Sequence, residues 1–415
     1  MPETAKTPVS ARSRQAVILV CFAVLIGIRL CGAAWLLQAH TEHDNNILGG
    51  DARRYDEISA GSGTAYRDFP LEYPPVTYAL IKATHGHDRA TTLDLLICSQ
   101  LVTDLTIVGV LAWAWNRRTA MAYLILSAPM IAFPFLYVRI DLLSVFLATL
   151  GLALVRKGLQ RSGGVTLAFA IYAKVWPIIL LPILLIERKT KATVAWAISL
   201  AACGIAWVAW AGVTGPDQVL TFRGSKGWQI ESMIGLIYHW SNPAGSHVEG
   251  GAWRTAAAAP TAARMMLTVL SGLVFLAAWF LAWQRRRSGS HESVVYGLAP
   301  LISILGLLIF APILSPQYLL WILPFAAIVA ARRNWFMAGL TLAVTWLTTI
   351  VFATIQTQTK GDFWSLVPVA VRNALLIVML IVGFVQLARP YDTNESSDNG
   401  LDQAHSERVT TTPSS

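Results

Sequence analysis

The chain has 415 residues, of which 55% are hydrophobic and only 13% are charged, and its mean hydropathy is +0.54. Soluble domains carry roughly 25% charged residues, so this composition excludes an ordinary soluble protein and predicts a polytopic membrane protein. The formal net charge of +9 does not indicate nucleic acid as a partner, because Lys and Arg recur in short clusters at the ends of apolar runs rather than in one basic stretch.

Apolar segments that could cross a bilayer recur from Ala16 almost to the C-terminus. Basic clusters between them are typical of cytoplasmic loops and include Arg117/Arg118, Arg156/Lys157/Arg161, Arg188/Lys189/Lys191, Arg285/Arg286/Arg287 and Arg332/Arg333. Threading the chain through these loops predicts an all-α fold of about twelve transmembrane helices with both termini in the cytoplasm. The expected spans are 16–38, 91–115, 119–138, 140–155, 163–173, 176–186, 193–213, 264–284, 293–312, 317–331, 335–356 and 365–388.

Two of these expected spans are short. The stretch 163–186 begins and ends beside cytoplasmic basic clusters, so it does not form a single crossing. Lys174-Val175-Trp176-Pro177 in its middle predicts a hairpin of half-length helices whose tip points outward.

The domain organisation follows from the same pattern. We expect a cytoplasmic N-terminal tail over 1–15, a membrane-embedded domain over 16–388, and a disordered cytoplasmic tail over 389–415 that is rich in Ser, Thr, Asp and Glu. Two outer loops, 39–90 and 214–264, are longer than ordinary connections, and long loops of this kind are usually functional or disordered.

The first outer loop contains a candidate general base. Asp51 and Tyr55 lie one helical turn apart if this piece is helical, and Arg53 and Arg54 between them could orient the carboxylate or contact a sugar. The alternative is that Asp51 is a solvated loop acid, and Asp44, Asp56 and Asp68 lie nearby.

Further along this loop, Glu72-Tyr73-Pro74-Pro75 precedes an apolar stretch that returns to the membrane interface. The prolines impose an extended approach. Glu72 and Tyr73 are therefore either part of a stiff junction or substrate-binding residues, and the sequence leaves both interpretations open.

Five charged residues are expected at the outer ends of spans or in the second outer loop: Arg139, Asp141, Lys174, Arg223 and Lys226. Each of them alone is explained by anchoring at the interface. Cations that converge with an acid around one cavity would instead suit a ligand that carries phosphate.

Ionisable residues also occur within the spans. Arg29 and Asp104 are expected near the middle of the first two long helices, as a structural pair or as a proton or ion relay, while Asp94 and Arg372 lie nearer the outer ends. The sequence has no Asp-x-Asp, P-loop, Gly-x-Gly-x-x-Gly or His-Glu-x-x-His motif, so we expect neither a metal nor a cofactor.

Several short motifs in order resemble glycosyltransferase family 87, an actinobacterial group of C-type polytopic membrane glycosyltransferases. They are Asp51-x-x-x-Tyr55, Glu72-Tyr73-Pro74-Pro75, Lys174-Val175-Trp176-Pro177, Gly227-Trp228-Gln229-Ile230-Glu231-Ser232 and Leu314-Ser315-Pro316-Gln317-Tyr318. The likeness spans nearly all of 16–389. It makes Gln229, Glu231, Gln317 and Tyr318 further candidates for substrate binding.

The resemblance implies an inverting transfer of a sugar, typically mannose, from a polyprenyl-phosphate donor on the outer face of the cytoplasmic membrane. The acceptor would be a glycolipid or a cell-wall glycan, the remaining partners would be membrane lipids, and the aspartate that acts as base corresponds to Asp51. The sequence departs from mannosyltransferases of the family at Ser315-Pro316-Gln317-Tyr318, where they often carry histidine, which leaves the sugar and the acceptor open.

Three alternatives remain at the level of sequence. A polyprenyl-lipid flippase or transporter would also need many spans, but it predicts inverted repeats and polar groups at mid-membrane. An oligosaccharide ligase or polymerase would differ from a monosaccharide transferase in the size of its donor. A non-catalytic assembly partner would show no transfer with any lipid-linked donor.

Overall fold

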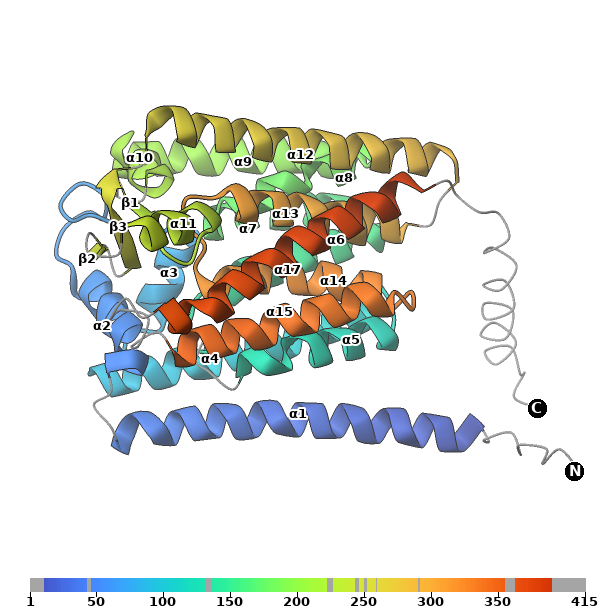
Figure 1. Cartoon of the computed structure of the whole chain (residues 1–415), viewed down its shortest axis with the longest axis horizontal. Helices are drawn as coiled ribbons and strands as arrows, with labels where there is room; N and C mark the ends of the chain where they lie inside the picture. Colours follow the sequence, from blue (N-terminus) through green and yellow to red (C-terminus); the bar gives the residue numbers. More distant parts are fainter. Residues whose placement is uncertain are drawn as a thin grey trace, which may run out of the picture.

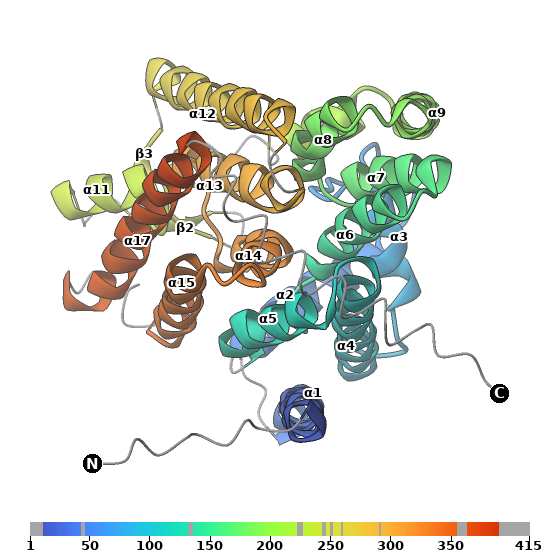
Figure 2. The same cartoon turned by 90° about the vertical axis from the view of Figure 1, so that its right-hand side faces the viewer.

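The computed structural model describes residues 11–42, 46–131, 136–221, 227–242, 246–249, 252–258, 260–289, 292–354 and 363–389. Helices dominate these residues, and the strands among them belong to one small sheet. The prediction of an all-α, multi-pass membrane protein is confirmed. Most of the long helices run along the horizontal axis of Figure 1, and Figure 2 shows the same bundle from one end.

The first half of the chain contains α1 (Ala11–Glu42), α2 (Asn46–Ala60), α3 (Pro75–Ala83), α4 (Arg89–Ala114), α5 (Arg117–Ser127), η1 (Ala128–Ile131), α6 (Leu142–Arg156), α7 (Gln160–Ala173), η2 (Trp176–Leu180), α8 (Leu181–Ile186) and α9 (Thr190–Ala211). The second half contains α10 (Thr214–Leu220), β1 (Gly227–Gln229), α11 (Met233–Ser241), β2 (His247–Glu249), β3 (Ala252–Ala258), α12 (Thr261–Arg287), η5 (Val294–Leu298), α13 (Ala299–Phe310), η6 (Pro316–Ile322), α14 (Leu323–Ala330), α15 (Trp335–Ala353) and α17 (Phe363–Ala388).

Each expected span coincides with a helix or with two short helices in succession. Among the described residues, six helices are long and apolar enough to cross a membrane, namely α1, α4, α9, α12, α15 and α17. The other expected spans, such as α6 and the pair η6 and α14, are shorter apolar helices. The count of twelve crossings stays a prediction.

Side-chain caps determine where three of the helices begin. Asp88 accepts a hydrogen bond from the backbone N–H of Thr91 at the start of α4. Asn116 and Asn334 cap α5 and α15 in the same way. These caps satisfy backbone donors that a helix leaves unpaired at its first turn.

Ion pairs join the basic clusters at one end of the bundle. Arg156 at the end of α6 donates to Glu292 at 3.0 Å, and Arg286 at the end of α12 donates to Glu187 at 2.7 Å. In Figure 1 the start of α1 and the end of α17 lie at this right-hand end, whereas α2, α3, α10, α11 and the sheet lie at the left. The two long loops therefore share the end opposite the basic clusters.

The hairpin predicted over 163–186 is present. Helix α7 ends at Ala173, Lys174 has an extended backbone, and η2 and α8 return toward the basic end, where Glu187 pairs with Arg286. A Cβ at Gly163 or Gly164 would collide with the backbone of α6 or α9, so these glycines allow close packing of α7 against both helices.

The second long loop folds into structure that the sequence did not predict. Its three strands form an antiparallel sheet in the order β1-β3-β2. Gln229 of β1 and His247 of β2 both lie opposite Arg254 of β3. This sheet holds Gln229 and Arg254 beside each other at the loop end of the bundle.

A buried polar network ties α1 to the bundle, at whose edge this helix lies in Figure 2. Asp104 of α4 accepts hydrogen bonds from Arg29 of α1 at 2.8 Å, from Tyr123 of α5 at 2.7 Å and from Tyr137 at 3.1 Å. Arg29 also donates to the backbone carbonyl of Leu124. Both charged groups are fully buried and paired, which favours the structural interpretation of this pair over a relay.

We expect the substitution Tyr123→Phe to lower the free energy of unfolding by about 1 kcal/mol, because it removes one hydrogen bond to the Asp104 carboxylate within the membrane. The rate of sugar transfer should not change. Denaturant unfolding in detergent together with a transfer assay checks both expectations. Lost transfer at unchanged stability would identify a relay instead.

Candidate active site

An ion pair marks the loop end of the bundle. Lys174 follows the last residue of α7, and its ammonium donates to Asp141 Oδ1 at 2.5 Å, just before α6 begins. Trp321 Nε1 donates to the same oxygen at 3.1 Å. Asp141 is 4% exposed and Lys174 is 20% exposed, so the carboxylate is enclosed while its cation reaches toward solvent.

Aromatic rings hold the Lys174 ammonium from one side. Its Nζ lies 4.6 Å from the ring centroid of Tyr318 and 5.3 Å from that of Trp321, and these two rings are stacked. The ring of Trp176 stacks on that of Trp321, with the two ring centroids 5.5 Å apart. Cation–π contacts of this kind add attraction and restrict the ammonium. Within the described residues Lys174 Nζ makes one hydrogen bond, so two of its three N–H groups remain for a ligand.

The loop motifs meet on the neighbouring side. Gln229 of β1 donates to Glu231 at 2.7 Å, and its side chain also contacts the Ser315 hydroxyl at 3.4 Å. The backbone N–H of Gln229 donates to the carbonyl of Pro312. Residues 227–232 and 312–318 are therefore fixed against each other, and the second segment supplies Tyr318 to Lys174.

Three arginines from separate parts of the chain join this group. Arg254 of β3 donates to the carbonyl of Gly227 at 2.9 Å and interacts electrostatically with Tyr318. Arg372 of α17 donates to the backbone carbonyl of Glu231 at 2.7 Å. The charge of Arg139 acts on both Glu231 and Tyr318.

We call this group the cationic cluster; it comprises Arg139, Asp141, Lys174, Glu231, Arg254 and Arg372. With both acids ionised, its four cations and two acids leave two positive charges in excess. An enclosed site with such an excess is suited to a phosphate group, and arginine and lysine are the side chains that bind phosphate most often.

Glu231 is the acid whose ionisation is most sensitive to this environment. Burial raises the pKa of Glu231 to about 7, although the charges of Arg372 and Arg139 and the hydrogen bond from Gln229 act in the opposite direction. Both forms of this carboxyl are therefore populated near neutral pH. The charge of the cationic cluster increases when Glu231 is protonated.

The motif residues of the first loop form a second group of contacts. Arg54 donates to both oxygens of Glu72, at 3.1 and 2.8 Å, in a bidentate pair. The rings of Tyr55 and Tyr73 meet edge to face at 6.1 Å. These contacts favour the interpretation of Glu72 as part of a stiff junction, since its carboxylate is engaged by Arg54.

This second group packs directly beside the cationic cluster. The Thr77 hydroxyl of α3 donates at 2.5 Å to the carbonyl of Ala173, the residue before Lys174. Ile140, between Arg139 and Asp141, packs in the same apolar core as Tyr55. The first loop is thus held against both segments that supply Lys174 and Asp141.

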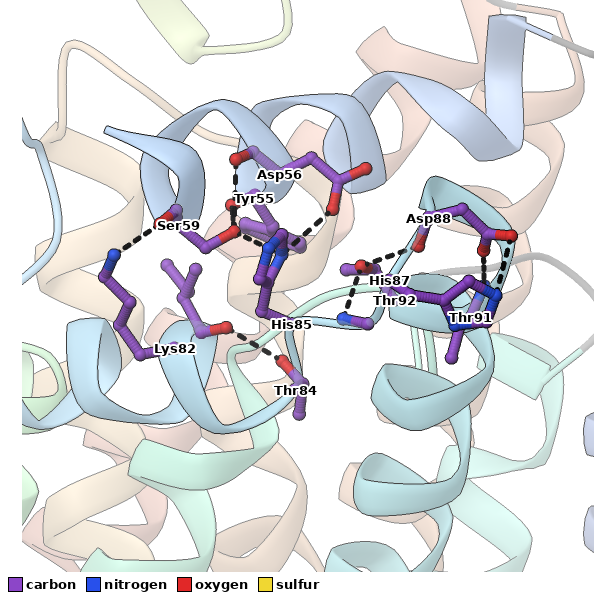
Figure 3. A network of polar contacts seen from close by, with 12 residues as sticks. Tyr55, Asp56, Ser59, Lys82, Thr84, His85, His87, Asp88, Thr91 and Thr92 are labelled. Carbon is purple, nitrogen blue, oxygen red and sulfur yellow. Dashed lines mark hydrogen bonds and ion pairs between the residues drawn. The ribbon is translucent and has the colours of Figure 1, made fainter. Parts of the chain in front are cut away.

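The second half of α2 is held through Asp56 and Ser59, as Figure 3 shows. His85 Nδ1 lies 2.7 Å from the hydroxyl of Ser59 and 3.6 Å from Asp56 Oδ1, and Lys82 donates to the carbonyl of Ser59. Asp68 lies elsewhere in the loop and accepts the backbone N–H of Thr64 at 2.5 Å. Asp68 therefore has a backbone partner, whereas Asp56 Oδ1 lies near His85 and makes no hydrogen bond within the described residues.

Position 51 itself belongs to α2, one helical turn before the buried Tyr55. The Asp51 side chain lies outside the described residues, because the side chains of α2 are described from Arg53 onward.

The structure brings together six of the residues expected from sequence: Arg139, Asp141, Lys174, Gln229, Glu231 and Tyr318. Gln317 is half-buried in η6 beside Tyr318. Arg53 is exposed and pairs with Glu57 at 3.8 Å, away from this group. Arg223 and Lys226 lie outside the described residues.

Sequence reasoning missed Arg254, Ser315 and Trp321 as members of the site, and it noted Arg372 without assigning it there. An arginine within an apolar span is itself a signal of function, so Arg372 could have been selected. Arg254 lies in a strand without an apolar pattern that would have revealed the sheet, and no local signal distinguishes it.

Comparison with known families gives one match. A model of glycosyltransferase family 87 matches residues 71–312, which is more than half of the chain. The matched region includes the segments that supply Lys174, Asp141, Glu231 and Arg254 to the cationic cluster. A search of curated protein sequences finds no match.

Proposed function

We propose that this chain, which belongs to glycosyltransferase family 87, moves a sugar, mannose in the simplest case, from a polyprenyl-phosphate donor to a lipid or glycan acceptor. Family membership makes it a membrane glycosyltransferase, and the identity of the donor, the sugar and the base are parts of the proposal. The observation that carries the proposal is the cationic cluster around Lys174, at the end of the bundle where the two long loops meet.

The proposed reaction is a single displacement. The acceptor hydroxyl attacks the anomeric carbon, its proton passes to the carboxylate of Asp51, and the bond from that carbon to the phosphate oxygen breaks. The electron pair leaves with polyprenyl phosphate, so negative charge grows on the phosphate. Lys174, Arg139 and Arg254 are the groups proposed to stabilise that charge, and attack opposite the phosphate inverts the anomeric centre.

The position of α2 supports Asp51 as the base. Position 51 lies on α2, whose Tyr55 belongs to the same buried apolar cluster as Ile140, the residue before Asp141. Of the neighbouring acids, Asp68 accepts a hydrogen bond from the backbone N–H of Thr64, and Asp56 lies 3.6 Å from His85.

We place this site on the outer face of the cytoplasmic membrane, with the basic end of the bundle and both termini in the cytoplasm. The support is the positive-inside rule, applied to the clusters around Arg156 and Arg286. The catalytic unit is proposed to be 16–388, with the terminal tails outside it.

A polyprenyl-lipid flippase remains the second candidate, because it would need the same phosphate-binding groups. It would also need polar groups along a path through the membrane. Arg29 and Asp104 are buried and paired with their neighbours, which favours transfer over transport. An oligosaccharide ligase would use the same site with a larger donor.

The test compares membranes from overexpressing and deletion strains, incubated with labelled polyprenyl-phosphomannose and other polyprenyl-phosphate sugars. The proposal requires a labelled product whose amount follows the level of the protein. Movement of intact labelled lipid across the membrane without a new glycosidic bond would support the flippase instead.

A further inference from the structure

Two buried members of the cationic cluster have atoms without a hydrogen-bond partner within the described residues. Glu231 is 6% exposed and Arg372 is fully buried. Within the described residues, Glu231 Oε1 and Arg372 Nη1 form no hydrogen bond, although the other atoms of both groups do.

The two groups are direct neighbours. Arg372 Nη2 donates to the backbone carbonyl of Glu231 at 2.7 Å, and the Arg372 charge is the largest electrostatic influence on the Glu231 carboxyl. A buried polar atom without a partner costs about 1 to 3 kcal/mol, and more when the group is charged. An open donor and an open acceptor on two buried residues in direct contact therefore indicate a place for a polar ligand.

The chemistry of that ligand follows from the two atoms. One acceptor and one donor complement a hydroxyl, which can donate to the carboxylate oxygen and accept from the guanidinium. The phosphodiester of the proposed donor has no hydrogen to donate to Glu231, and its charge would be repelled by the ionised carboxylate. Lys174 is the better phosphate ligand. Its ammonium hydrogen-bonds one acid of the described residues, Asp141, and has N–H groups left for a ligand.

Resting on the proposed function, we propose that Glu231 and Arg372 form a subsite that binds a sugar hydroxyl during transfer, separate from the groups that bind phosphate. Gln229 orients the carboxyl through its hydrogen bond to Oε2, which leaves Oε1 for the ligand. The hydroxyl belongs to the transferred sugar or to a sugar of the acceptor, and the two sources share this chemistry.

The test measures binding without turnover. Octyl α-mannoside and its four monodeoxy forms are titrated into purified protein, followed by the shift in thermal unfolding. For the wild type we expect one monodeoxy form to bind about 10- to 100-fold more weakly, because a hydrogen bond to a charged group is worth about 1.5 to 3 kcal/mol. Glu231→Gln should bind the full mannoside as weakly as that form and show no further loss with it.

The matched control is Glu57→Gln, which makes the same change at an exposed acid of α2. It should retain the wild-type discrimination. Equal weakening of all five compounds by Glu231→Gln would assign Glu231 a purely structural role, and a wild type that binds all five equally would also overturn the subsite.

Transfer assays with polyprenyl-phosphomannose and its monodeoxy forms then identify the source of the hydroxyl. Sensitivity to deoxygenation of the donor assigns it to the transferred sugar, and sensitivity in a mannoside acceptor assigns it to the acceptor; both outcomes support the subsite. Discriminating binding by a wild type that transfers no sugar would refute the proposed function and retain the subsite.

Discussion

Replacing Asp51 with Asn is expected to slow turnover by about 10²- to 10⁴-fold, which is the usual contribution of a general base. Asparagine keeps the size and hydrogen bonding of the side chain but cannot accept the acceptor proton. Binding of the lipid donor should persist, since the groups proposed to bind its phosphate, Lys174, Arg139 and Arg254, are unchanged. Single-turnover kinetics with a labelled polyprenyl-phosphate sugar separate the two effects.

The controls for this prediction are Asp56→Asn and Asp68→Asn in the same loop. Asp56 faces His85 and Asp68 binds the backbone of Thr64, so both variants should remain active. If Asp51→Asn turned over normally while one of the controls was inactive, the base would be that residue. Full activity of all three variants would exclude a single base in this loop.

The substitution Lys174→Gln should weaken binding of the lipid-phosphate donor by about 10- to 100-fold, because it removes a charge-assisted hydrogen bond worth about 1.5 to 3 kcal/mol. Loss of the leaving-group contact should also lower the maximal rate. Equilibrium binding of the donor and steady-state kinetics measure both effects. Lys157→Gln, which makes the same change at an exposed residue on the basic end, is the matched control.

A double substitution distinguishes phosphate binding from simple neutralisation of Asp141. Asp141→Asn together with Lys174→Gln removes both charges of the pair and so leaves no buried carboxylate unpaired. If Lys174 only neutralised Asp141, this double variant would regain donor affinity. We expect its affinity to stay as low as that of Lys174→Gln, because the phosphate would still lack its cation.

Much of the fold could be predicted because a membrane-spanning helix is recognisable from its local sequence alone. A run of apolar residues bounded by Arg and Lys needs no tertiary information to be placed in a membrane. The hairpin around Lys174 was predictable for the same reason, since both of its ends lie beside basic clusters. The sheet of the second loop was not, because β1 and β2 have only three residues each and no alternating pattern.

The candidate site was predictable only in part because its residues come from six distant segments. Short motifs pointed to Lys174 and Glu231, but their approach to Arg254 and Arg372 depends on how α17 and the sheet pack. Glu72 shows the opposite limit: its motif suggested ligand binding, whereas its carboxylate is held by Arg54. A motif identifies candidate residues. Three-dimensional contacts are needed to distinguish a structural role from a role in substrate binding.

Reconstitution of the purified protein into vesicles with two classes of labelled donor tests the proposed transfer most directly. We predict that sugar passes from polyprenyl-phosphomannose to an acceptor with inversion at the anomeric carbon, that a nucleotide sugar gives no product, and that Asp51→Asn slows transfer by about 10²- to 10⁴-fold. Transfer from the nucleotide sugar, or undiminished transfer by Asp51→Asn, would contradict the proposed donor or the proposed base.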